Sequence, residues 1–130
     1  MKFKYVLVAI GLVSQAAMAD EAERAFATEL LDCSAYYQIA SEAVASMNSP
    51  QMASVASRLS SQAEESKALA ATYLPADELI QALDAARQKQ ILSMKDAKDL
   101  AGLMATHKEQ CKSILADPKA RLEYWAMATM

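Results

Sequence analysis

The chain has 130 residues, of which 54% are hydrophobic, and a formal net charge of −3. A chain of this length suits one domain with a modest core. Binding to nucleic acid needs concentrated positive charge, so this acidic balance argues against a nucleic-acid partner.

Residues 1–19 have the pattern of a cleaved signal peptide. Two early lysines precede an apolar run at 6–13, which is far shorter than the roughly 20 residues needed to span a bilayer. The triplet Ala-Met-Ala then ends at Ala19, just before the acidic Asp20, and small residues at its first and third places suit signal peptidase. We therefore predict cleavage after Ala19, a periplasmic or secreted mature protein and no stable membrane anchor after cleavage.

Residues 20–130 are predicted to form a single all-α domain. The whole chain has only 2 Gly and 3 Pro, and alanine, leucine, glutamine, glutamate and lysine are abundant after Ala19. These residues lose little conformational freedom in a helix, so the composition favours helices before any periodicity is considered.

The first predicted helix covers residues 20–47. Its apolar residues recur at alternating spacings of four and three, which is typical of a helix that buries one stripe against its neighbours. This stripe consists of Phe26, Leu30, Cys33, Tyr37, Ala40, Val44 and Met47. The helix is expected to end at Asn48, which tolerates a left-handed backbone, while Ser49 can cap the next helix and Pro50 can begin it.

Three more long helices are predicted to follow. The second, 50–73, has a weak apolar face rich in small residues, and Pro75 separates it from the third. No Gly or Pro marks the end of the third helix, but Ser93 and Asp96 have the spacing of a weak capping box, so we predict a reversal there. The apolar face of the fourth helix consists of Ala97, Leu100, Met104, His107, Cys111 and Ile114.

The two cysteines, Cys33 and Cys111, both lie on apolar helix faces. Exported thiols are expected to pair, and the alternative is two free thiols in the core. Bridged Cα atoms must lie within roughly 7 Å. At ~1.5 Å of rise per residue, a reversal near Ser93–Asp96 brings Cys111 nearly level with Cys33. We therefore predict an up-down-up-down four-helix bundle, a short C-terminal fifth helix and one disulfide joining helices one and four.

The fifth helix is predicted to begin at Asp117-Pro118 and contains the single Trp of the chain. Tyr124, Trp125 and Met127 belong to residue types that are enriched at protein interfaces. Either this helix folds across the end of the bundle and covers its core, or these three side chains stay exposed as a contact surface for a partner. The sequence leaves both interpretations open.

Possible chemistry depends on His107, the only histidine. The cysteines are expected to be oxidised, and motifs for a di-metal carboxylate site, covalent haem attachment or a phosphate loop are absent. We therefore predict no catalytic residue and no cofactor. Met104 precedes His107 by about one turn, so a haem or metal site that uses both is a speculative alternative. Otherwise His107 lies at the bundle edge or is partly buried and hydrogen-bonded, and the methionines fill the core.

Three classes of function remain, and the first is favoured. The first is an exported, non-catalytic binding protein that docks a protein partner, as an inhibitor, an immunity protein or an envelope accessory factor does. The second is a carrier that holds haem, a metal or an apolar molecule in the bundle, where a helix rich in small residues leaves a cavity. The third, an enzyme, lacks any recognisable set of catalytic residues.

Export has a direct test. When the protein is purified from the periplasm of an expressing bacterium, peptide mapping should find Asp20 as its first residue, because the Ala-Met-Ala triplet directs cleavage after Ala19. A mature protein that retains Met1 would contradict the prediction.

Overall fold

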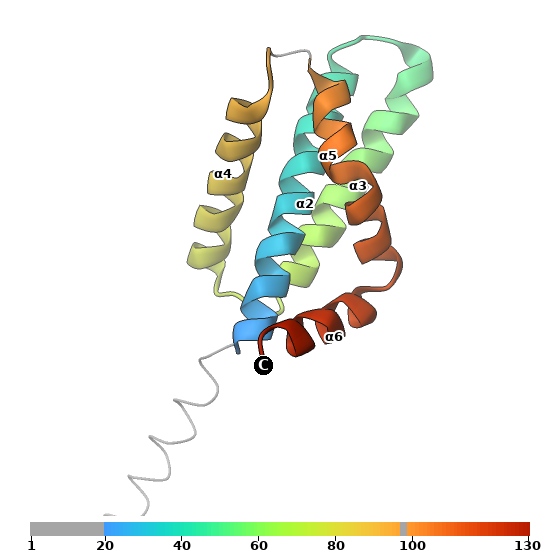
Figure 1. Cartoon of the computed structure of the whole chain (residues 1–130). Coiled ribbons are helices and arrows are strands. Elements are labelled where there is room, and N and C mark those ends of the chain that lie inside the picture. The colour runs from blue at the N-terminus through green and yellow to red at the C-terminus, as the bar shows by residue number, and fades with distance from the viewer. Residues whose placement is uncertain (1–19, 97–98) are drawn as a thin grey trace, which may run out of the picture.

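The computed structural model describes residues 20–96 and 99–130, which fold into helices without any strand in that part of the chain. The elements are α2 (Glu21–Ala45), the 3-10 helix η1 (Pro50–Met52), α3 (Ala53–Ala70), α4 (Ala76–Ser93), α5 (Leu100–Ala116) and α6 (Pro118–Ala128) (Figure 1). The prediction of an all-α protein is confirmed for these residues. The predicted signal peptide lies outside them.

Helix α2 is the centre of the fold, because α3, α4, α5 and α6 all pack against it. Figure 1 shows α3, α4 and α5 along α2, with α6 across the end where α2 begins. The larger buried side chains of α2 are Phe26, Leu30, Leu31, Cys33, Tyr36, Tyr37, Ile39 and Val44. They cover far more than one stripe, which is the pattern of a helix surrounded by protein.

Both ends of α2 have local causes. Asp20 is the N-cap: its carboxylate accepts from the backbone N of Glu23 at 2.7 Å, and Glu23 Oε1 accepts from the backbone N of Asp20 at 3.1 Å. This capping box satisfies two amides at the helix start. The helix ends at Ala45, two residues earlier than predicted, so Met47 lies beyond it and is 56% exposed. Asn48 takes a left-handed φ of 53°, as predicted.

Helix α3 packs against α2 through small residues. Its buried side chains are Ala56, Ala63, Ser66 and Ala70. Small side chains let the two backbones approach closely, and two serines of α2 use this proximity. Ser34 Oγ donates to the backbone O of Ala63 at 2.8 Å, and Ser41 Oγ donates to that of Ala56 at 2.9 Å. The predicted cap at Ser49 is wrong, because its side chain makes no capping hydrogen bond to η1.

Helix α4 ends at Ser93 and α5 begins at Leu100, so a break between two helices lies where the sequence predicts one, but with a different cap. Ser93 is the last residue of α4, and its Oγ donates back to the carbonyl of Gln90 at 2.6 Å, so Ser93 does not cap α5. Asp99 is the N-cap of α5 and accepts from the backbone N of Gly102 at 3.2 Å. A Cβ at Gly102 would lie 2.8 Å from Asp99 Oδ1, so a larger residue there would require the Asp99 side chain to shift.

The predicted disulfide between Cys33 and Cys111 is confirmed. Cys33 belongs to α2 and Cys111 to α5, their Cα atoms are 5.5 Å apart, and both residues are 2% exposed. Leu103 and Ile114 are the other buried residues of α5. The disulfide is therefore a large part of what attaches α5 to α2.

Glu29 of α2 attaches α6 to the bundle. Its carboxylate accepts from Arg121 Nε and Nη2, both at 2.7 Å, from Trp125 Nε1 at 3.0 Å and from Gln110 Nε2 at 2.9 Å. The predicted start of α6 at Asp117-Pro118 is confirmed, because Asp117 caps the helix by accepting from the backbone N of Ala120 at 3.2 Å and Pro118 occupies the first turn. A carboxylate that is largely shielded from water and accepts four hydrogen bonds holds its partners more firmly than an exposed pair does.

Replacing Cys33 by Ser should lower the thermal midpoint by more than about 10 °C in oxidising buffer, since the bond closes a loop with a sequence separation of 78 and contributes about 4 kcal/mol in the chain-entropy model. Circular dichroism melting measures this change. The double variant with Cys33→Ser and Cys111→Ser separates loss of the bond from the effect of a free thiol. A midpoint equal to that of the wild type would contradict the structural role.

Candidate functional site

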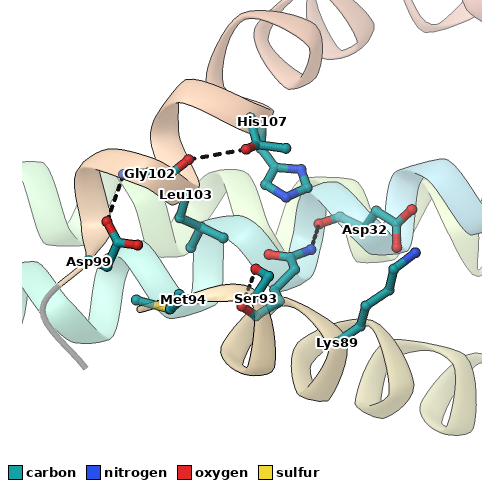
Figure 2. A pocket seen from close by; sticks show the side chains of 10 residues that line it. Asp32, Lys89, Ser93, Met94, Asp99, Gly102, Leu103 and His107 are labelled. Carbon is teal, nitrogen blue, oxygen red and sulfur yellow. Dashed lines mark hydrogen bonds between the residues drawn. The ribbon is translucent and has the colours of Figure 1, made fainter. Parts of the chain in front are cut away.

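A polar pocket lies between α2, α4 and α5 and has a volume of about 340 Å³. Figure 2 shows side chains from the three helices facing this space. The lining residues that can recognise a ligand by charge or hydrogen bonding include Asp32, Lys89, Gln90, Ser93, Thr106 and His107. We call this cavity the polar pocket.

Opposite charges meet in the polar pocket. Lys89 extends toward the carboxylate of Asp32 in Figure 2. Burial raises the pKa of Asp32, while the positive charge of Lys89 and the nearby His107 oppose this shift. Burial also lowers the pKa of His107, with Asp32 opposing and Lys89 adding to the change. At neutral pH the imidazole is therefore mainly neutral.

Gln90 connects α4 to α2 beneath the polar pocket. Its Nε2 donates to the backbone O of Asp32 at 2.8 Å, whereas its buried Oε1 has no hydrogen-bond partner among the described residues. The two hydroxyls of the pocket are engaged locally. Ser93 Oγ donates to Gln90 O, and Thr106 Oγ1 donates to Gly102 O at 3.1 Å. The geometry supplies polar recognition groups and places neither hydroxyl as a nucleophile bonded to His107.

An apolar groove lies on the other side of α5. It has a volume of about 420 Å³ and lies above α2, between α3 and α5. Both helices pack against α2 but hardly against each other, and this leaves the space. The groove residues are Tyr36, Tyr37, Ala40, Val44, Met47, Met52, Val55, Arg58, Leu59, Gln62, Leu100, Met104, Lys108 and Lys112.

The two speculative ligand residues lie on different cavities. His107 lines the polar pocket, whereas Met104 lines the groove. Tyr36 lies between these regions: it is 2% exposed, lines the groove and stacks on the His107 ring with 5.6 Å between ring centroids. Met94 shares the polar pocket with His107. The pairing of His107 with Met104 around one ligand is therefore not the arrangement that the structure presents.

The predicted contact residues of α6 do not form one surface. Trp125 is partly buried and donates to Glu29. Tyr124 is 50% exposed, with the Arg121 guanidinium 4.1 Å from its ring centroid, and Met127 is 75% exposed. Tyr124 and Met127 are one turn apart, so they share the outer face of α6. The structure thus combines the two interpretations: Trp125 packs on the bundle end while its neighbours face solvent.

Sequence reasoning missed the polar pocket, the lining of the groove and the role of Glu29. One signal was present in the sequence. Residues 26–40 are apolar on most faces, and the only carboxylates among them are Glu29 and Asp32. Acids within so apolar a segment need partners from neighbouring helices. The small residues of 50–73 predicted a cavity along that helix but not its lining, because the groove residues come from three helices and become neighbours only after packing.

No described helix is long and apolar enough to cross a membrane. Among the described residues, no group of three or more His, Cys, Asp and Glu side chains could hold a metal ion. No protein-family model, curated protein or solved structure matches the chain.

The charges around His107 can be tested by NMR, because the chain has a single histidine. Titration of its imidazole protons between about pH 5 and 8 should give a pKa below the usual 6.5, since burial disfavours the charged ring. Asp32→Asn should lower this pKa further, because it removes a negative charge that stabilises the imidazolium. Lys89→Gln should raise it. Equal pKa values in all three proteins would contradict the arrangement of Asp32, Lys89 and His107.

Proposed function

We propose that the protein is an exported, non-catalytic binding protein of the periplasm, and that its groove carries a small apolar molecule. The observation that supports carriage best is the groove itself. Its volume of about 420 Å³ lies within the range of small-molecule sites, about 300–1,000 Å³. Most of its lining side chains are aliphatic, aromatic or methionine, which favours an apolar ligand.

The scaffold around the groove supports this function. We infer an up-down-up-down bundle for the four long helices, in which α2 forms the floor of the groove and α3 and α5 form its sides. Tyr36 and Val44 are almost fully buried in the floor. The disulfide and the Glu29 hydrogen bonds restrain the C-terminal half of α5. A ligand site on fixed helices loses little conformational freedom on binding.

The disulfide between Cys33 and Cys111 supports the proposal that the protein is exported. A disulfide that attaches one side of the groove to its floor forms and persists in an oxidising compartment such as the periplasm. The predicted signal peptide leads there. In a reducing compartment the bond would be lost, and α5 would be held mainly by Leu103, Ile114 and the contacts around Glu29.

A protein partner is the second candidate function, and the outer face of α6 supports it. Tyr124 and Met127 are exposed there, and Arg121 stacks on Tyr124. Aromatic residues, methionine and arginine are enriched at protein interfaces. The surface is small, however, because Trp125 is turned toward Glu29. The groove is therefore the better supported binding site.

Carriage in the groove can be tested with the neutral fluorescent probe N-phenyl-1-naphthylamine. The purified mature protein should bind it in a one-to-one ratio with increased emission, because the groove removes the probe from water. Met104→Trp should weaken this binding by about tenfold or more, since the larger side chain occupies the groove.

Met94→Trp is the matched control, because Met94 is also a partly buried methionine near the reversal but lines the polar pocket. It should bind the probe as the wild type does. Circular dichroism melting shows whether both variants fold. Failure of the wild type to bind, or equal binding by folded Met104→Trp, would overturn the proposal of a carrier.

A further inference from the structure

The groove is apolar at one end. Met47 follows the end of α2, Met52 and Val55 lie at the start of α3, and Leu100 begins α5. Figure 1 shows the end of α2 and the starts of α3 and α5 at the same end of the molecule. Methionine side chains adapt their shape to an inserted chain more readily than branched residues do. This end suits a flexible aliphatic chain.

The rest of the groove carries positive charge. Arg58 of α3 and Lys108 and Lys112 of α5 are its lining residues with a charged side chain, and all three are exposed cations. None of them takes part in a salt bridge within the described part of the chain. The whole protein has a net charge of −3, so the groove is positively charged in a protein that is negatively charged overall.

Lys108 and Lys112 are four residues apart, so they are neighbours on α5. Two like charges at this spacing repel, and an anion placed near both relieves the repulsion. Tyr36 and Tyr37 line the same region. Burial, with smaller contributions from Tyr36 and Glu65, raises the pKa of Tyr37 to about 12, so its phenol keeps its proton at neutral pH.

We propose that the groove binds a single-chain fatty acid, with its aliphatic chain toward the Met47–Met52 end and its carboxylate near Lys108 and Lys112. This inference rests on the proposed function and adds the chemical class of the ligand. From Leu100 to Lys112, α5 advances about 18 Å, so the groove has the elongated shape of an acyl chain. The groove is apolar at its methionine end and positively charged near the two lysines, and a fatty acid likewise has an apolar chain and a negatively charged head group.

The charges of the groove favour an anionic ligand over other small apolar ligands. A neutral molecule gains nothing from Lys108 and Lys112, and a cationic one is repelled.

Isothermal titration calorimetry with dodecanoate, dodecanol and dodecyltrimethylammonium tests this inference. The three probes share one chain and differ in the charge of the head group, and each is used below its aggregation threshold. Wild-type mature protein should bind dodecanoate about tenfold or more tightly than the other two. Added salt should reduce this preference, because the lysines are exposed.

The double variant with Lys108→Gln and Lys112→Gln should lose the preference for dodecanoate and retain binding of dodecanol. Its matched control is the double variant with Lys95→Gln and Lys119→Gln, which has the same net charge and changes only exposed lysines outside the groove. This control should prefer dodecanoate as the wild type does. If both double variants lose the preference for dodecanoate equally, the preference is a general effect of net charge, and the proposed role of Lys108 and Lys112 is overturned.

The possible failures are distinguishable. If N-phenyl-1-naphthylamine binds but the three dodecyl probes bind equally or not at all, the fatty-acid inference is wrong and the apolar carrier remains. If neither the dye nor any dodecyl probe binds, both proposals fail. If an acidic amphipathic peptide binds in a manner that depends on Lys108 and Lys112 while dodecanoate does not, the groove is a peptide site and the inference is overturned.

Discussion

The burial of α2 on most of its faces is the constraint on which the rest of the structure depends. The other α-helices contact α2 more than they contact one another. Each of them therefore has its own attachment to α2. Small residues and serine hydrogen bonds hold α3, and the disulfide holds α5. Helix α4 is held by Gln90 and by Arg87, which donates to Gln38 of α2 at 2.9 Å, and α6 is held by Glu29. Changes in α2 should consequently affect every interface, whereas changes in an outer helix act locally.

This arrangement also produces the cavities. Because α5 is fixed to α2 mainly at Leu103, Cys111 and Ile114, space remains on both of its sides. The space toward α4 is polar and contains Asp32, Lys89 and His107, and the space toward α3 is the groove. Tyr36 and His107 stack between the two. The charged groups of the polar pocket and the apolar surface of the groove thus lie on opposite sides of α5.

Several features could be predicted from local sequence because their causes are local. The left-handed Asn48, the proline starts and the Asp117 cap each depend on a few adjacent residues. The predicted cap at Ser93 was wrong because Ser93 is the last residue of α4 and Asp99 caps α5, while the side chain of Ser49 makes no capping hydrogen bond. The predicted stripe of α2 was correct from Phe26 to Val44 and wrong at Met47, which lies beyond the helix and is exposed. It was also too narrow, because α2 is buried on most of its faces.

The sequence by itself determined the helical class, the approximate helix boundaries and the pairing of Cys33 with Cys111, because composition, periodicity and an even number of cysteines are properties of the chain alone. Only the tertiary structure decided that His107 and Met104 line different cavities and that Arg58 joins Lys108 and Lys112 along one groove. The physical reason is that a cavity forms where helices fail to contact one another. That depends on the relative placement of α3 and α5, which no periodicity within either helix specifies.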